Sequence, residues 1–245
     1  MALELGTIAV NTANIPGAPT DAIVTIPDAP FDGLLVAVSD GASGDPSSRW
    51  IMFGSGQTYA CCADLIFFQT YTTNQPGGQQ VGAWFFSANS LPSSGTYPVL
   101  YTKGYSGDGY RFAVYPLRAN GNGVAVRQWK GFGTVNSADV TVVVDTPAVS
   151  SSFLVGLASN GNNNSYDIFP FVNSLINDGG GPAGNTFLIC HEFNPTETTS
   201  YRFRSSGAAN RHALAVLEIV DIAAVTSDST ISYESFFIYR AVVGQ

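Results

Sequence analysis

Short runs rich in Val, Ile, Tyr and Phe recur about every ten residues along this chain, separated by clusters of Gly, Pro, Asn, Asp and Ser. Helical periodicity is nearly absent. Runs of this kind favour strands, and their spacing predicts an all-β sandwich or barrel rather than β-α-β units. The expected strands cover residues 22–26, 33–39, 50–53, 65–71, 81–87, 96–102, 110–117, 124–132, 140–145, 153–158, 186–193, 200–204, 212–220 and 231–243.

Alternation within the runs assigns side chains to faces. Tyr201 and Phe203 alternate with Arg202 and Arg204. Because successive side chains of a strand point to opposite faces, the aromatic residues are expected in the core and the arginines towards solvent. The run 110–115 alternates in a similar way.

Two further runs, 33–38 and 213–220, are apolar at nearly every position, which predicts central strands covered on both faces. No linker-like segment divides the chain. The expected fold is therefore one continuous β-sandwich of about a dozen antiparallel strands in two sheets. An N-terminal arm (1–19) precedes this body (20–222), and a C-terminal strand extension (223–245) packs on it.

The two halves of the chain echo each other. The run 34–41 resembles 153–161 with one residue inserted, and Tyr-Arg-Phe occurs at both 110–112 and 201–203. Two interpretations stay open. One is an ancient duplication, and the other is convergence of similar strand positions in two packed sheets.

Composition excludes several functions. Charged residues make up 11% of the chain, against about a quarter in typical domains, and the net charge is −8 without any basic run. Binding to nucleic acid or to an anionic membrane requires a basic surface, so neither is expected. The N-terminal residues do not read as a secretory signal, and the apolar runs are too short to span a bilayer. We expect a soluble protein that is made in the cytoplasm.

The chain has three cysteines, Cys61, Cys62 and Cys190. Small buried thiols in strands are the favoured interpretation. The alternative is one disulfide between Cys190 and either Cys61 or Cys62, which leaves one thiol over.

The segment Cys190-His191-Glu192 is the densest group of reactive side chains. On a strand, Cys190 and Glu192 face one way and His191 the other, so the three cannot converge. A Cys–His dyad would require His212 to approach Cys190 across strands. No metal-ligand spacing and no Gly-x-Ser-x-Gly motif occurs. We predict a non-enzymatic protein without cofactor or metal.

The acidic residues define no catalytic pair. Many of them lie in predicted turns, where an aspartate commonly accepts hydrogen bonds from its own backbone. Residues 40–45 contain oxygen ligands but lack the alternating acids of a calcium loop. The predicted turn aspartates are Asp28, Asp32, Asp40, Asp45, Asp108 and Asp178.

Exposed aromatic rings on a sandwich can stack on sugar rings or contact a partner protein, whereas buried ones belong to the core. Sequence alone leaves both interpretations open for Tyr101 and for each candidate contact residue. The candidates for partner or glycan contacts are Trp50, Trp84, Trp129, Tyr105, Phe236 and Tyr239.

Three segments also follow a familiar order. They are the apolar run 33–38, then 81–86 followed by Pro-Ser-Ser-Gly-Thr-Tyr-Pro-Val at 92–99, and lastly 140–144 leading to 153–156. This order resembles jelly-roll β-sandwich domains of structural proteins in tailed-bacteriophage virions and of related bacterial surface proteins. The resemblance covers roughly residues 20–220 and includes no catalytic or ligand motif.

The resemblance implies a jelly-roll-like fold and a structural protein of the virion, with a capsid decoration (cement) protein that stabilises the shell through protein–protein contacts as the favoured role. Its expected partners are copies of itself, as a homo-oligomer, and other capsid proteins. The alternative is a carbohydrate- or receptor-binding module of a phage tail or bacterial surface.

Overall fold

A computed structural model of the chain describes most of its strands and the shorter connections between them. The described residues are 3–11, 20–26, 31–41, 49–55, 58–62, 64–70, 79–88, 91, 94–103, 109–119, 123–134, 138–149, 151–161, 164–178, 185–207, 211–222 and 238–239.

The described strands form four antiparallel sheets, which we name A to D. Sheet A has the order β1-β10-β4-β8-β7, with β2 also on β10; sheet B has the order β3-β9-β5-β6. The strands of these two sheets are β1 (Glu4–Leu5), β2 (Ala9–Val10), β3 (Thr20–Ile26), β4 (Gly33–Asp40), β5 (Arg49–Ser55), β6 (Thr58–Cys62), β7 (Asp64–Thr70), β8 (Gln80–Ser87), β9 (Gly95–Lys103) and β10 (Tyr110–Arg118).

Sheet C has the order β15-β16-β13-β18-β11-β19, and sheet D has the order β12-β17-β14. Their strands are β11 (Val124–Thr134), β12 (Asp139–Val143), β13 (Phe153–Asn160), β14 (Tyr166–Phe169), β15 (Asn173–Asp178), β16 (Thr186–Phe193), β17 (Ser200–Ser205), β18 (His212–Asp221) and β19 (Ile238–Tyr239).

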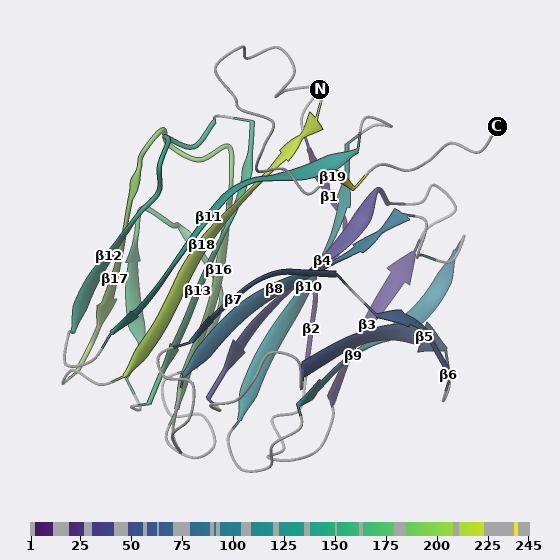
Figure 1. The fold of residues 1–245 in the computed structure, drawn as a ribbon, viewed down its shortest axis with the longest axis horizontal. Coiled ribbons are helices and arrows are strands. Elements are labelled where there is room, and N and C mark those ends of the chain that lie inside the picture. The colour runs from purple at the N-terminus through teal and green to yellow at the C-terminus, as the bar shows by residue number, and fades with distance from the viewer. Residues whose placement is uncertain are drawn as a thin grey trace.

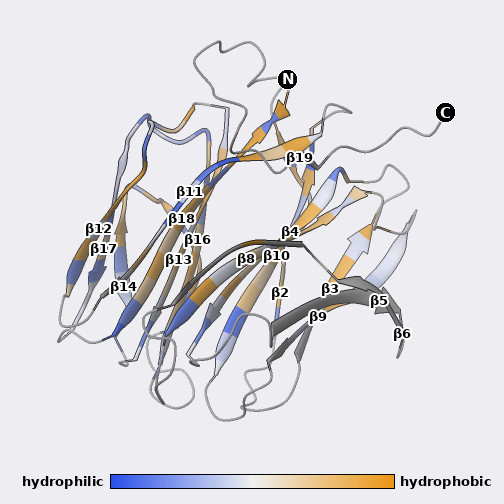
Figure 2. Cartoon of the chain, viewed as in Figure 1, coloured by the Kyte–Doolittle hydropathy of each residue, from blue (hydrophilic) through white to orange (hydrophobic). Residues whose placement is uncertain are grey.

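The sheets stack in the order B, A, C, D, as Figure 1 shows from right to left. Sheets A and C face each other across the central core, which contains Leu35 and Tyr115 from sheet A and Val155 and Leu217 from sheet C. A second core fills the space between A and B, and a third fills the space between C and D. The inner sheets are thus covered on both faces, which explains their continuous apolar runs (Figure 2).

The two halves follow the same path through these layers. From β12 to β18 the chain visits the sheets in the order D, C, D, C, C, D, C. From β3 to β10 it visits B and A in the matching order B, A, B, A, A, B, A, with β6 as an additional strand of sheet B after β5. Strand β4 therefore corresponds to β13, β8 to β16 and β10 to β18. The shared topology favours the duplication that the sequence left open.

The structure also corrects the sequence correspondence. Leu35 and Ser39 of β4 point towards sheet C, and Val155 and Ser159 of β13 point towards sheet A. The two strands therefore align without an inserted residue. The two Tyr-Arg-Phe runs are not equivalent, because one lies on β10 in an inner sheet and the other on β17 in an outer sheet.

The predicted all-β antiparallel sandwich is confirmed, although the described strands form four sheets rather than two. Each half contributes its own pair of sheets, and the two pairs stack. The predicted faces of β17 are also confirmed, with Tyr201 and Phe203 buried and Arg202 and Arg204 exposed. Strands β14 and β15 were not predicted, because their short runs contain Asn or Asp residues that weaken the strand signal. The short strand β6 was not predicted either.

Parts of both terminal segments lie on the inner sheets. Strands β1 and β2 pair with β10, and β19 pairs with β11 at Val124 and Ala125. The rest of the predicted N-terminal arm after residue 11 and of the extension beyond residue 222 lies outside the described residues.

Candidate functional site

The residues of the conceivable Cys–His dyad do not come together. Cys190 pairs with Gly156 of β13, whereas His212, on the other side of β13, pairs with Asn160, four residues further along that strand. The Cys190 thiol is fully buried and lies 3.3 Å from the Gly156 carbonyl oxygen, and burial raises its pKa. His212 instead shares a 2.8 Å hydrogen bond with the Tyr166 hydroxyl through Nδ1. A protonated, enclosed thiol without a base has no route to nucleophilic chemistry.

His191 occupies the opposite face of β16 from Cys190, as alternation predicted. Its ring meets the Tyr115 ring edge-on, with centroids 5.6 Å apart, and burial lowers the pKa of His191. The Tyr115 hydroxyl and His191 Nδ1 are both buried without a hydrogen-bond partner. Two unsatisfied polar atoms at this contact lower the stability of the folded chain.

A buried polar junction links the two halves at one end of the central core. Ser39 Oγ donates to the Ala158 carbonyl at 2.6 Å, and Ser159 Oγ lies 2.9 Å from the Asp40 carbonyl. Ser159 Oγ also contacts Gln79 Oε1, and Gln79 Nε2 donates to Asn185 Oδ1 at 3.0 Å. These side chains hydrogen-bond to one another and to the backbone. The junction therefore fixes the position of sheet A relative to sheet C, and its polar groups are not available to a ligand.

A second buried polar group surrounds Glu218. Arg127 Nη1 and Gln128 Nε2 donate to its Oε2 at 2.7 Å and 2.6 Å, and the Val149 amide donates to Oε1 at 2.8 Å. Both charges are paired, with the side chains of Arg127 and Glu218 exposed by only 9% and 1%. This arrangement anchors the segment after β12 to β11 and β18, which is a structural role.

The predicted turn aspartates have other partners where they are described. Asp32 accepts from the Ala119 amide at 2.5 Å, Asp40 accepts from the Tyr101 hydroxyl at 2.8 Å, and Asp178 pairs with Arg111 at 2.5 Å. The prediction of local backbone caps missed these long-range bonds, because each aspartate lies close to a strand of a different segment. Asp28, Asp45 and Asp108 lie outside the described residues.

One open hollow of about 330 Å³ lies beside β1. Glu4, Thr7, Thr25, Phe31 and Arg118 line it, and the Arg118 guanidinium carbon sits 5.3 Å from the centroid of the Phe31 ring. Arg118 also approaches Glu4 at 3.9 Å. The only acid and the only base of the hollow thus face each other, which leaves no unpaired charge to recognise a ligand.

Metal ligands are not gathered in the described part of the chain: no three His, Cys, Asp or Glu residues lie close enough to hold an ion. Among the described residues, no helix has the length and apolar character needed to cross a bilayer.

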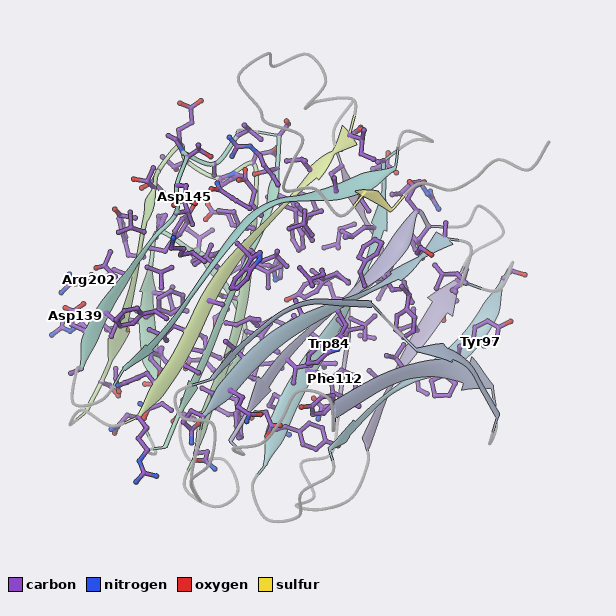
Figure 3. All side chains as sticks on the ribbon, in the orientation of Figure 1. Trp84, Tyr97, Phe112, Asp139, Asp145 and Arg202 are labelled. Carbon is purple, nitrogen blue, oxygen red and sulfur yellow. The ribbon has the colours of Figure 1, made fainter. Side chains whose placement is uncertain are left out.

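Large apolar side chains are exposed on the flanks of the stack. Phe169 and Val172, around the end of β14, are 72% and 77% exposed, and Val143 on β12 is 53% exposed. Figure 3 shows Asp139 and Arg202 of the same outer sheet pointing away from the core. We call Val143, Phe169 and Val172 the sheet D patch.

Strand β11 of sheet C carries a further exposed pair, because Trp129 is 40% and Phe132 48% exposed. Ile23 on β3 is exposed by 55% at the opposite flank, on sheet B.

The candidate contact residues divide into three groups. Trp129 is exposed. Trp84 is 3% exposed and packs 6.0 Å from Tyr101 between sheets A and B (Figure 3), so a partner or glycan cannot reach it in the folded chain. Both faces of its strand are covered, which the local sequence pattern did not reveal. The side chains of Trp50, Tyr105, Phe236 and Tyr239 lie outside the described part.

Comparison with known proteins gives little further guidance. No family model matches the chain, and no curated protein matches it. Among solved structures, it is similar to a conserved protein of unknown function, PA5104 from Pseudomonas aeruginosa PAO1. The two share 14% sequence identity over 88% of this chain and 99% of that one, with a TM-score of 0.27. A likeness at this level carries no argument about function.

Proposed function

We propose that this protein is a non-enzymatic structural protein that acts by binding other protein chains, and that it decorates and stabilises the capsid of a bacteriophage. The observation that carries the proposal is the contrast between its interior and its flanks. Reactive groups such as Cys190 and Glu218 are buried or paired, whereas the sheet D patch exposes apolar side chains to solvent. Large apolar side chains that are exposed together on one surface are typical of protein contact sites.

The composition supports the same proposal. With 11% charged residues, the surface depends on Ser, Thr, Asn and Gln for its polarity. Neighbouring copies in a crowded assembly therefore repel each other less than copies of a highly charged protein do. The phage setting comes from the order of the three sequence segments described above.

The experiment is size-exclusion chromatography with light scattering, on the protein with and without capsids of the phage that encodes it. Wild-type protein is expected to elute with the capsids. Phe169→Ser combined with Val172→Ser is expected to elute separately, because it removes two apolar contacts from the sheet D patch. Ile23→Ser is the matched control, since it removes an exposed apolar side chain from the opposite flank. Wild-type protein that never accompanies capsids would contradict the proposal.

A second candidate, binding of carbohydrate, is favoured by one observation, the exposed ring of Trp129. A glycan array distinguishes the two functions. Specific binding that Trp129→Ala abolishes, together with no capsid binding, would replace the first proposal with this one.

A further inference from the structure

The sheet D patch depends on the two strands that flank β17. Strands β12 and β14 pair with opposite sides of β17, where Val143 of β12 lies opposite Ser200 and Phe169 of β14 lies opposite Arg202. Val172 follows three residues after Phe169. The positions of the three patch residues relative to one another are therefore set by whatever holds these two flanking strands in place.

One contact holds the start of β14. The Asn177 side chain of β15 accepts from the Tyr166 amide at 3.0 Å and donates to the Tyr166 carbonyl at 2.8 Å. An amide side chain that bonds both backbone groups of one residue replaces the pairing that a neighbouring strand would provide. Tyr166 lies three residues before Phe169, so this contact ties the strand that carries Phe169 to sheet C.

A matching contact holds the segment after β12. Gln128 Nε2 on β11 donates to the Thr146 carbonyl at 2.8 Å, and its Oε1 accepts from the Thr146 amide and hydroxyl at 3.3 Å. Thr146 lies three residues after Val143. Sheet C thus holds both flanking strands of sheet D through the same two-way bond between a side-chain amide and a backbone peptide.

The buried ion pair orients the Gln128 amide. Gln128 Nε2 also donates to Glu218 Oε2 at 2.6 Å, which places the donor end of the amide towards Glu218 and leaves Oε1 for the Thr146 amide. Arg127 pairs with the same carboxylate and donates to the Pro147 carbonyl at 2.9 Å. A buried ion pair by itself is weak evidence for stability, and orienting a neighbouring contact gives this one a role.

The turn after β14 is anchored from within. Phe171 lies between the exposed Phe169 and Val172, and only 7% of it is exposed. Its ring centroid lies 5.6 Å from that of Tyr201, and its Cε2 would lie 2.9 Å from a Cβ added at Gly156. The glycine leaves the room that the ring occupies, so the backbone between the two exposed patch residues is fixed to the core.

We propose that Gln128 and Asn177 are positioning residues for partner binding, which hold the flanking strands of sheet D so that the sheet D patch has its binding geometry before a partner arrives. This inference rests on the proposed function, because it concerns the same contact surface. A surface that is ordered in advance loses less conformational freedom on binding and therefore binds more tightly. Neither residue belongs to the patch, so each acts through the strand that it holds.

Hydrogen exchange in the free protein tests the two contacts separately. Asn177→Ala is expected to speed exchange at the Tyr166 amide by about tenfold more than at the Thr146 amide, and Gln128→Ala is expected to do the reverse. Each variant is thus the control for the other, since a general loss of stability would speed exchange at both amides alike. Equal effects at the two amides, or none, would overturn the proposal.

Capsid affinity tests the consequence for binding. Co-sedimentation with capsids, at a temperature where every variant is folded, is expected to show about tenfold weaker binding by Asn177→Ala and by Gln128→Ala. Tyr101→Phe is the matched control, because it removes a 2.8 Å hydrogen bond to Asp40 between sheets B and A and leaves sheet D unchanged. It is expected to bind as the wild type does. Wild-type affinity in both amide variants would overturn the proposal.

The outcomes separate this inference from the proposed function. Wild-type protein that never binds capsids would contradict capsid decoration, and exchange at the two amides would still decide whether Gln128 and Asn177 hold sheet D. Capsid binding that is equally strong in the wild type and in both amide variants would overturn only the positioning role.

Discussion

At the scale of single residues, the central core contains polar groups that are buried without a hydrogen-bond partner. The Tyr115 hydroxyl is the plainest example, because it is fully buried and has no hydrogen-bond partner. Leaving a buried donor unpaired costs about 1–3 kcal/mol.

Tyr115→Phe is therefore expected to raise the free energy of unfolding by about 1 kcal/mol. Tyr101→Phe is the matched control, and it is expected to lower the free energy of unfolding, because the Tyr101 hydroxyl donates to Asp40 at 2.8 Å. Urea denaturation of both variants measures the difference. If Tyr115→Phe destabilises the protein as much as Tyr101→Phe does, the Tyr115 hydroxyl has a partner such as a bound water.

His191 makes stability depend on pH. Burial lowers its pKa in the folded chain, so the unfolded chain takes up the proton first as the pH falls. The resulting stability is fully present above the unfolded pKa of about 6.5 and is lost as the pH falls through the folded pKa. Between pH 7.5 and pH 5, His191→Phe is expected to lose less unfolding free energy than the wild type. An equal loss in both proteins would show that His191 does not contribute.

At the scale of elements, one asparagine joins two sheets. The Asn177 side chain on β15 accepts from the Tyr166 amide at 3.0 Å and donates to the Tyr166 carbonyl at 2.8 Å. It thus bonds to the β14 backbone as a neighbouring strand would, and it closes the gap between the edges of sheets C and D.

Asn177→Ala is expected to lower the free energy of unfolding by about 1–3 kcal/mol, because the Tyr166 backbone loses both bonds. Asn173→Ala removes an exposed asparagine from the same strand and is expected to have little effect. Hydrogen exchange at the Tyr166 amide gives a local measure of the same contact. Unchanged protection of that amide in Asn177→Ala would contradict this role.

The elements also show what can be predicted from sequence. Alternation identified the buried face of β17, and continuous apolar runs identified the doubly covered strands β4 and β18, because both patterns depend only on neighbouring residues. It did not identify β14 or the Asn177 contact, since an asparagine reads as a turn signal until its distant partner is known. The burial of Trp84 also depends on a sheet that is distant in sequence, so local sequence did not reveal it.

The candidate surfaces were harder to predict than the fold. The exposure of Trp129 and the burial of Trp84 follow from which sheet lies over each strand. The hydrogen bond between Ser159 and Gln79 joins residues of different halves, and only the stacking of sheets A and C brings them together. That stacking cannot be predicted from the local sequence.

At the scale of the whole molecule, the central core unites the halves. Sheet A and sheet C each contribute side chains such as Tyr115 and Leu217 that are completely buried between them. The polar junction of Ser39, Gln79 and Ser159 fixes their relative position. Neither half can separate without exposing one complete face of its inner sheet.

We therefore expect one cooperative thermal transition in differential scanning calorimetry, with equal calorimetric and van't Hoff enthalpies for the folded unit. Two transitions, each with about half of the total enthalpy, would show that the halves unfold independently.

The proposed function is that this protein stabilises a capsid by binding to it. The most direct measurement heats capsids, with and without the purified protein, and follows the release of packaged DNA with a fluorescent dye. Release is expected at a higher temperature when the protein is bound, and no such shift is expected with the Phe169→Ser, Val172→Ser variant. Release at the same temperature with and without the wild-type protein would contradict it.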